Sequence, residues 1–289
     1  METTAHIPVS PESTHRFLDL DELPLVHLAV AARTDVGRIR KGNEDTLHAS
    51  ANAHRGLFIV ADGMGGHAAG EVASEMAVEI VTTELADLND LETPDAQERV
   101  ARALRDANRA VYERTRIERD KMGMGSTVSA LLLSDNRYIV GHVGDSRIYI
   151  ARDGHMDQLT RDHSLVQEHV DAGLLTAEQA RRHPQSNVIT RCIGMADEID
   201  PDVFDGSAKI GDSFLLASDG LTGMVEDRRI QQLLMSRATP ARIVDALILE
   251  ANNNGGNDNI TAVVVRVLAA ETNTSEHEIT PLPPARTHG

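Results

Sequence analysis

Seven short runs of aliphatic and β-branched residues are the feature that most constrains how this chain folds. Each run has the length of a β-strand, and some are separated by turns as short as residues 134–136. Connections this short favour antiparallel hairpins. The runs are residues 25–32, 56–61, 127–133, 137–144, 146–151, 213–218 and 260–267.

Helical periodicity appears in three places between these runs. Residues 70–88 place apolar side chains on one face. A second helix is predicted to begin with Thr93 as the cap and Pro94 in its first turn. A third begins at Thr239-Pro240 and ends at residues 254–256. Helices in pairs and strands in meanders indicate an α+β layered domain rather than a wound parallel sheet.

The chain of 289 residues is long enough for one large domain. It has no Trp and only one cysteine, Cys192, so aliphatic residues must form the core and an internal disulfide is excluded. We expect a flexible N-terminal extension over 1–23, a domain over 24–269 and a flexible tail over 270–289, because both ends lack apolar periodicity.

The formal net charge of −17 disfavours partners that are themselves anionic. Nucleic acid and acidic membrane surfaces would repel such a chain. The N-terminus has no basic region followed by an apolar run, and no stretch of 18 consecutive apolar residues occurs. We therefore expect a cytoplasmic protein that binds neither nucleic acid nor membrane.

Carboxylates stand at the ends of the predicted strands, next to glycines. The sequence LFIVADGMGGH delivers Asp62 to the end of an apolar strand, and LLASDG delivers Asp219 in the same way. The glycines let the backbone approach whatever these carboxylates hold. If the strand ends meet, four or more carboxylates share one cleft. The other acids of this set are Asp145 between two strands, Asp258 before the last strand, and Glu44 with Asp45 in RKGNED.

Such a set of like charges requires cations. Oxygen ligands without paired Cys or His select Mg²⁺ or Mn²⁺, with Ca²⁺ as an alternative. Two ions roughly 3.5 to 4 Å apart would activate a shared water for in-line attack on phosphorus. Arg40 is the candidate for holding the phosphoryl oxygens, because a planar guanidinium binds two of them at once.

Seven motifs in this order resemble the metal-dependent serine/threonine protein phosphatases of type 2C, in their short bacterial form. The motifs are RKGNED, VADGMGGH, GSTVSA, GHVGDSRIY, LTRDHS, LLASDG and DNITAVVV, and the resemblance covers about residues 26–268. It implies a four-layer α-β-β-α sandwich, with two antiparallel sheets flanked by pairs of antiparallel helices. It also implies hydrolysis of phosphoserine and phosphothreonine by water, without a phosphoenzyme.

The resemblance also implies the metal ligands. Asp62 would bridge two Mn²⁺ or Mg²⁺ ions, and the carbonyl of Gly63 would bind the first of them. Asp219 and Asp258 would bind the second ion. Asp145, together with Asp219, would form the third-metal site reported in bacterial members.

The same resemblance assigns catalytic roles to three further residues. Glu44 and Asp45 would hold metal-bound waters, and Arg40 would bind the phosphoryl group. The general acid stays open, because Met64 occupies the position where eukaryotic relatives have His; His67 and a metal-bound water are the alternatives. The implied partners are phosphorylated proteins and a cognate serine/threonine kinase, and we expect a monomer.

The resemblance implies that residues 165–186 form a mobile flap beside the active site. The alternative interpretation is a surface helix-turn. The remaining motifs have structural interpretations. Asp153-Gly154 and Asp205-Gly206 read as plain hairpin turns, and Cys192 as a small core residue. Two rival functions stay open: a pseudophosphatase that binds phosphoproteins without turnover, and a structural calcium-binding module.

Overall fold

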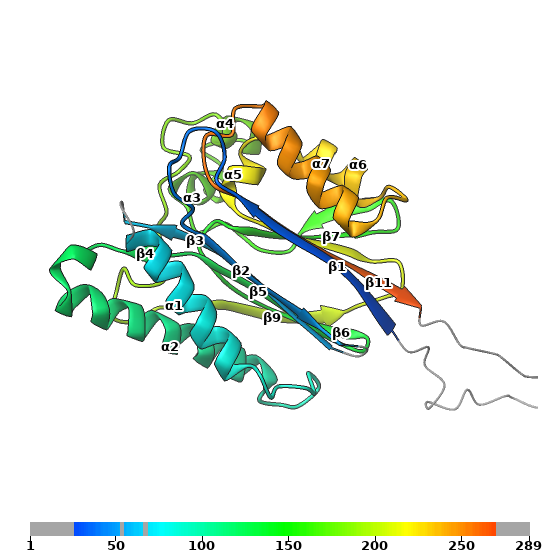
Figure 1. The fold of residues 1–289 in the computed structure, drawn as a ribbon, viewed down its shortest axis with the longest axis horizontal. Coiled ribbons are helices and arrows are strands. Elements are labelled where there is room, and N and C mark those ends of the chain that lie inside the picture. The colour runs from blue at the N-terminus through cyan, green and yellow to red at the C-terminus, as the bar shows by residue number, and fades with distance from the viewer. Residues whose placement is uncertain (1–25, 53–54, 66–68, 270–289) are drawn as a thin grey trace, which may run out of the picture.

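The computed structural model describes residues 26–52, 55–65 and 69–269, in which two antiparallel sheets pack face to face between layers of helices (Figure 1). The predicted terminal segments 1–23 and 270–289 lie outside the described residues, as does His67. One sheet has the strand order β1-β11-β10-β7-β8; the other has the order β2-β3-β5-β6-β9, and β4 pairs with β3. Their bounds are β1 (Val26–Asp35), β2 (Asp45–Ala51), β3 (Arg55–Met64), β4 (Gly125–Ser126), β5 (Val128–Ser134), β6 (Arg137–Val143), β7 (Arg147–Arg152), β8 (His155–Gln158), β9 (Asp202–Ser207), β10 (Ser213–Ala217) and β11 (Ile260–Ala269).

Helices cover the outer face of each sheet. The helices α1 (Ala69–Glu84) and α2 (Ala96–Ile117) run antiparallel along the sheet that contains β3 (Figure 1). The helices α6 (Asp227–Leu234) and α7 (Pro240–Asn253) cover the other sheet, beside the short α5 (Asp219–Thr222). The predicted four-layer α+β sandwich is therefore confirmed. Two further helices, α3 (Leu165–Asp171) and α4 (Ala177–Arg181), lie outside these layers, and Arg119–Lys121 forms one 3-10 turn.

Period-two alternation in the buried strands builds three apolar layers. In β3, Leu57 and Ile59 pack under α1 and α2, whereas Phe58 and Val60 face the opposite sheet. The run of valines in β11 divides in the same way between the helix layer and the layer between the sheets. Continuous apolar runs are expected where both faces of a strand are covered.

The alternation also positions the acids. Asp62 follows Phe58 and Val60 at even spacing, so it continues the row that faces the space between the sheets. Asp45 is its cross-strand neighbour in β2. The functional carboxylates therefore lie at one end of the sandwich, where the apolar filling stops.

All seven predicted strands are present, but four others were not predicted: β2, β4, β8 and β9. Strands β2, β8 and β9 are only partly buried, and β4, although buried, has only two residues. Such strands lack the apolar run by which the others were recognised.

Asp205-Gly206 was wrongly predicted as a turn, since both residues lie inside β9. Gly206 is needed there because a Cβ would stand 2.4 Å from the Tyr138 ring in the neighbouring strand. Asp153-Gly154, by contrast, does form the β7–β8 turn, with positive φ at both residues.

Two helix ends also differ from prediction. The first helix stops at Glu84 rather than at residue 88. The second begins at Ala96 with Asp95 as its cap, because Thr93 and Pro94 form a turn whose Thr93 carbonyl accepts from the Ala96 N–H. The start of α7 at Thr239-Pro240 and its end at Asn254 are confirmed.

Candidate metal centre

Five aspartates from both sheets meet at one end of the sandwich: Asp45, Asp62, Asp145, Asp219 and Asp258. We call them the acidic centre. Asp45 begins β2, and Asp62 lies near the end of β3. Asp145 lies in the β6–β7 turn, Asp219 begins α5 directly after β10, and Asp258 precedes β11. Their charges repel one another: besides burial, each of the other four aspartates raises the pKa of Asp62.

The backbone of Asp62 is fixed by the motif GSTVSA. The Asp62 N–H donates to Thr127 Oγ1 at 2.9 Å, and the Thr127 N–H donates to the Asp62 carbonyl at 2.9 Å. The hydroxyl of Ser126 donates to the same carbonyl at 3.1 Å. The sequence motif supports the family resemblance, but it does not predict that these residues hold Asp62.

Gly63 occupies a position that no other residue fits. A Cβ there would lie 2.1 Å from the Gly70 carbonyl oxygen and 2.6 Å from that of Glu44. The Gly63 N–H donates to the Glu44 carbonyl at 3.0 Å, which ties the RKGNED loop to the end of β3. Glycine is thus required for the close approach of three backbone segments.

A similar close approach brings Asp219 and Asp258 together. A Cβ on Gly220 would lie 2.0 Å from the Asn259 carbonyl oxygen, so α5 touches the start of β11. The Asn259 amide reaches in the other direction, because its Oδ1 accepts from the Glu44 N–H at 2.8 Å. Asn259 was not singled out from the sequence, although it lies in DNITAVVV.

Asp45 is bound on one side only. Its Oδ2 accepts from the hydroxyls of Ser218 and Thr261, each at 2.7 Å. Its Oδ1 is buried with no hydrogen-bond partner among the described residues, and the same holds for Oδ1 of Asp219. Buried carboxylate oxygens without partners are costly unless a cation binds them.

Withdrawal from water and mutual repulsion perturb the whole centre. Burial, followed by the neighbouring aspartates, raises the pKa of Asp62 and Asp145 well above the usual range. The same burial raises the pKa of Asp45 to about 7, against the hydrogen bonds from Thr261 and Ser218. The pKa of Asp219 is raised as well, by burial and then by the neighbouring Asp258.

This donor set fits divalent cations that prefer oxygen ligands. Within residues 26–52, 55–65 and 69–269, no three acidic, imidazole or thiol side chains already stand in ligating geometry. The hydroxyls of Ser218 and Thr261 hold Asp45, and Arg40 holds Asp258. The centre therefore has the ligand chemistry and the unsatisfied oxygens of a metal site.

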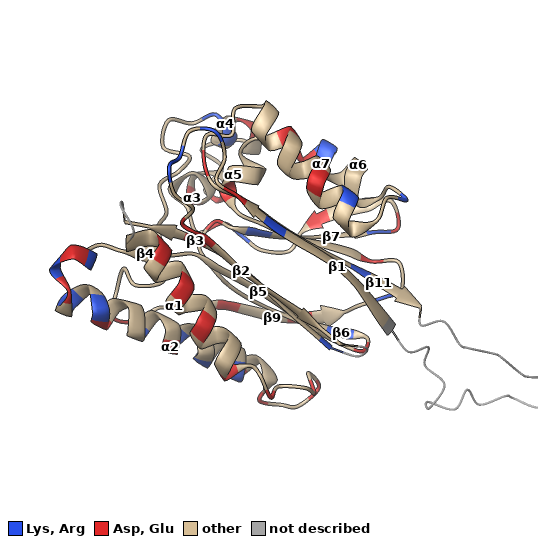
Figure 2. Cartoon of the chain, in the orientation of Figure 1, with Lys and Arg blue, Asp and Glu red and all other residues tan. Residues whose placement is uncertain are grey.

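Arg40 reaches the centre from the basic loop between β1 and β2 (Figure 2). Its Nη2 donates to Asp258 Oδ2 at 2.6 Å. Both side chains are partly exposed, so the pair can open towards a ligand. Glu44 is half-buried beside the start of α1, where its Oε2 lies 2.9 Å from the position of a Cβ on Gly70.

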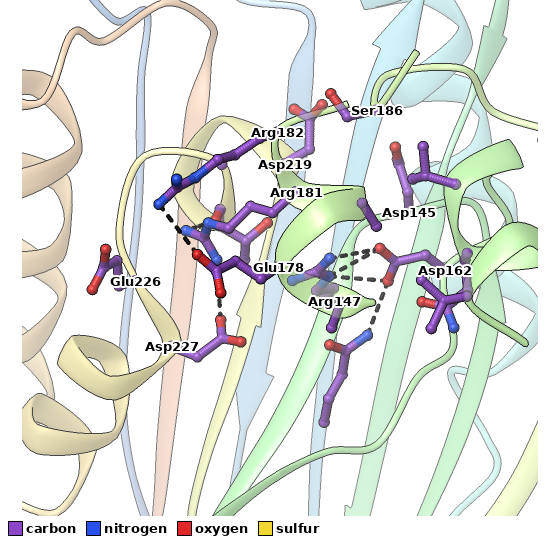
Figure 3. A pocket seen from close by; sticks show the side chains of 18 of the residues that line it. Asp145, Arg147, Asp162, Glu178, Arg181, Arg182, Ser186, Asp219, Glu226 and Asp227 are labelled. Atoms are coloured by element: carbon purple, nitrogen blue, oxygen red, sulfur yellow. Dashed lines mark hydrogen bonds and ion pairs between the residues drawn. The ribbon is translucent and has the colours of Figure 1, made fainter. Parts of the chain in front are cut away.

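Residues 165–186 form α3, α4 and their connections, which we call the flap. It covers a cavity of about 750 Å³ whose lining includes Asp145 and Asp219 (Figure 3). Arg181 of α4 crosses this cavity and donates from Nη2 to the carbonyls of Thr222 and Val225, each at 2.8 Å. The flap is thus anchored to the end of α5, the helix that Asp219 begins.

Two other buried titratable side chains, Cys192 and His142, have structural roles. Burial raises the pKa of the Cys192 thiol to about 11, with a smaller effect from Asp145, so it is a poor nucleophile. His142 is buried, and its pKa is lowered to about 4 because it is withdrawn from water and lies beside His163. Neither residue faces a substrate as a reactive group.

Comparisons with known proteins agree with the seven motifs. A family model described as Protein phosphatase 2C matches residues 38–261. Protein phosphatase PhpP of Streptococcus pneumoniae is 41% identical over 239 residues, which cover 82% of this chain and 97% of the relative.

Solved structures share the fold. The serine/threonine phosphatase PstP/Ppp of Mycobacterium tuberculosis is 40% identical with a TM-score of 0.75, covering 84% of this chain and 99% of that one. A catalytic domain of the serine threonine protein phosphatase PstP, in complex with 2 manganese ions, is 39% identical with a TM-score of 0.73 over the same shares.

Proposed function

This chain belongs to the protein phosphatase 2C family, and from that membership we propose that its acidic centre binds Mn²⁺ or Mg²⁺ for phosphoester hydrolysis. The protein is a metal-dependent serine/threonine protein phosphatase of the bacterial type. The assignment to this centre rests on carboxyl groups that are buried beside one another, two of whose oxygens have no hydrogen-bond partner. Asp62, Asp145 and Asp219 have raised pKa values because they are withdrawn from water beside one another.

The proposed ligands divide into three groups. Asp62 and the Gly63 carbonyl would hold the first ion, and Asp62 with Asp219 and Asp258 would hold the second. Asp145 and Asp219 would hold a third. The orphaned Oδ1 of Asp219 supports this division, because a cation can bind a buried carboxylate oxygen that has no hydrogen-bond partner.

Bound divalent ions supply Lewis acidity, which lowers the pKa of water and neutralises charge on the phosphoryl oxygens. The chain's own residues position the reactants. Arg40 exchanges Asp258 for the phosphoryl group, since its guanidinium lies at the partly exposed edge of the centre. Glu44 and Asp45 accept hydrogen bonds from waters at the centre, and the orphaned Oδ1 of Asp45 supports this role.

The proton donor for the leaving group keeps two candidates, His67 and a water molecule at the centre. His67 lies outside the described residues. Met64, which occupies the expected histidine position, ends β3 and cannot donate a proton. A pH profile of the variant His67→Gln separates the two candidates, because loss of the acid would remove one ionisation from the rate.

The proposal extends to the cellular setting. The substrates are phosphoproteins made by a serine/threonine kinase, since phosphoserine and phosphothreonine arise by that class of reaction. The enzyme works as a monomer in the cytoplasm, which size-exclusion chromatography and cell fractionation would test. Within the described residues, no helix has the length and apolar character needed to cross a membrane.

The deciding experiment follows phosphate release from a phosphothreonine peptide. Release that depends on Mn²⁺ or Mg²⁺ is expected, with Ca²⁺ as the comparison ion. Tight peptide binding without phosphate release would favour the pseudophosphatase. A Ca²⁺-dependent rise in melting temperature with no hydrolysis under any ion would favour the calcium-binding module.

A further inference from the structure

Residues 160–163 hold the β6–β7 turn from both ends. We call residues 144–148 the Asp145 turn and residues 160–163 the brace. Asp145 stands inside the turn, and its carboxylate is buried. Among the described residues, the brace forms hydrogen bonds with the residues that flank Asp145.

His163 forms two hydrogen bonds with Gly144, the first residue of the turn. The Gly144 N–H donates to His163 Nδ1 at 3.0 Å, and the His163 N–H donates to the Gly144 carbonyl at 2.7 Å. Gly144 has φ +115°, and a Cβ there would lie 2.5 Å from Thr127 Cγ2. The turn therefore has an unusual backbone conformation that His163 secures from one side.

The contacts determine the tautomer of His163. A backbone N–H can only donate, so Nδ1 must carry the lone pair and Nε2 the proton. Nε2 lies 3.2 Å from Asp202 Oδ2 and 3.0 Å from Arg191 Nη1. Because an arginine can only donate, Asp202 is the neighbour that accepts from the Nε2–H. Asp202 is held in place by Arg191, whose Nη1 donates to its other oxygen at 2.9 Å. The imidazole is buried and its pKa is lowered, which maintains the neutral form.

The other end of the turn is held in a similar way. Asp162 accepts from Nε and Nη2 of Arg147, with the shortest distance 2.7 Å (Figure 3). The Ile148 N–H donates to Thr160 Oγ1 at 3.0 Å. Asp145 is consequently fixed between two bonded anchors, beside the carboxylate of Asp219 that raises its pKa.

The brace also joins the flap. The His163 carbonyl accepts from the Thr190 N–H at 2.8 Å, and the Leu165 N–H donates to the Val188 carbonyl at 2.9 Å. Ser164 caps α3. The two chain segments that enter and leave the flap therefore meet at the residue that holds Gly144.

We propose that His163, as its neutral Nε2–H tautomer, is a positioning residue that sets the geometry of the Asp145–Asp219 ion site through Gly144. This rests on the proposed function, because it takes these two aspartates as ligands. His163 contacts neither substrate nor ion; it acts by accepting the Gly144 N–H. Groups that orient metal ligands in this way are typically worth about 10- to 100-fold in metal affinity.

Two substitutions separate the two nitrogens of His163. Asparagine can place an acceptor near the Nδ1 position, whereas glutamine can place a donor near Nε2 and leaves the Gly144 N–H without a partner. We take the Mn²⁺ site lost in Asp145→Asn as the Asp145–Asp219 site, and expect His163→Asn to retain its affinity within about 3-fold. His163→Gln should weaken that site by about 10-fold or more and spare the other sites. Isothermal titration calorimetry with Mn²⁺ measures both.

A second readout concerns the backbone directly. Amide hydrogen exchange of Gly144 should be faster in His163→Gln than in His163→Asn, because only the former lacks its acceptor. If His163→Gln does not fold, Asp202→Ala serves instead, since it removes the partner of Nε2 at a half-exposed position. It should weaken the same Mn²⁺ site.

Controls distinguish this inference from the proposed function. Asp145→Asn must abolish one Mn²⁺ site; if it does not, the assigned ion site is wrong. His155→Gln, at an exposed histidine of β8, should bind Mn²⁺ as the wild type does. If Asp145→Asn abolishes the site but His163→Gln binds Mn²⁺ normally, or weakens every site equally, the positioning role of His163 is overturned.

Discussion

Asp45 and Asp62 stand directly opposite each other across the antiparallel strands β2 and β3. Like charges in directly opposed cross-strand positions destabilise a sheet. Their carboxyl groups are further withdrawn from water at the end of the sandwich, and the pKa of each is raised. The fold therefore retains a pairing that is unfavourable without cations, at the place where we propose that the metal ions bind.

Removing one of these charges should abolish catalysis without harming the fold. Asp62→Asn is expected to reduce Mn²⁺-dependent hydrolysis of p-nitrophenyl phosphate by roughly 10³-fold or more, because a shared ligand is lost. The melting temperature of the metal-free variant should be equal to or above that of the wild type, since repulsion is relieved. Asp245→Asn, an exposed acid paired with Arg33, is the control. Full Mn²⁺-dependent activity of Asp62→Asn would contradict the assignment.

Metal binding should release protons. The folded-state pKa of Asp45 is raised from 3.8 to about 7, so the metal-free protein binds a proton between these values that the unfolded chain has lost. This contribution to stability is full below about pH 4 and is lost as the pH rises through about 7. A divalent ion beside Asp45 favours the ionised form of its carboxylate, so the affinity for Mn²⁺ should increase with pH over this window.

The measurement is calorimetric titration with Mn²⁺ at about pH 6 in two buffers of different ionisation enthalpy. We expect release of at least about one proton, and about one fewer in Asp45→Asn. A melting curve is less suitable, because buried His142 has a lowered pKa and its contribution to the free energy of unfolding decreases as the pH falls. That pH dependence is opposite to the one expected from Asp45. Binding with no proton release in either buffer would be the contrary result.

A methyl group at Gly63 should destabilise the protein. The Cβ of Gly63→Ala would approach two backbone carbonyls, at 2.1 and 2.6 Å, and backbone cannot move aside as a side chain can. The expected loss in the free energy of unfolding is roughly 2–4 kcal/mol. Gly42→Ala is the matched control, since nothing lies within 4 Å of its Cβ. Urea unfolding compares the two, and equal midpoints would contradict this reading of the site.

Arg40 should act through the substrate more than through stability. Its ion pair with Asp258 is partly exposed and contributes little to folding. Arg40→Lys keeps the charge but cannot bind two phosphoryl oxygens, so kcat/KM for p-nitrophenyl phosphate should fall by about 10- to 100-fold. Arg33→Lys, on the neighbouring strand β1, is the control. Unchanged kinetics in Arg40→Lys would exclude a bidentate phosphoryl contact.

Arg181 should hold the flap closed over the cavity. Arg181→Ala removes two hydrogen bonds to backbone carbonyls of residues 222 and 225, so the flap should exchange amide hydrogens and be cleaved by protease several-fold faster. Arg182→Ala is a close control, because among the described residues the Arg182 side chain pairs with exposed Glu178 and not with the end of α5. Equal cleavage rates for the two variants would rule out the anchor.

The layered fold could be predicted from local patterns. Fully buried strands such as β3 and β11 appear as unbroken apolar runs, and Pro240 marks a helix start, because these signals depend on neighbours in sequence. Strand β9 was missed since it is only half-buried, and Gly206 within it was taken for a turn. Its real requirement is the Tyr138 ring of the adjacent strand, which no local pattern shows.

The sequence by itself determined which residues supply oxygen ligands and a guanidinium, because residue type and position at strand ends are local properties. Only the tertiary structure decided how those groups are held: Thr127 on the backbone of Asp62, Ser218 and Thr261 on Asp45, and His163 on the turn of Asp145. These partners are between 19 and 216 residues apart in sequence. Hydrogen bonds form only when donor and acceptor lie about 3 Å apart. Pairing of distant strands brings these residues within that distance, so their contacts cannot be predicted from local sequence.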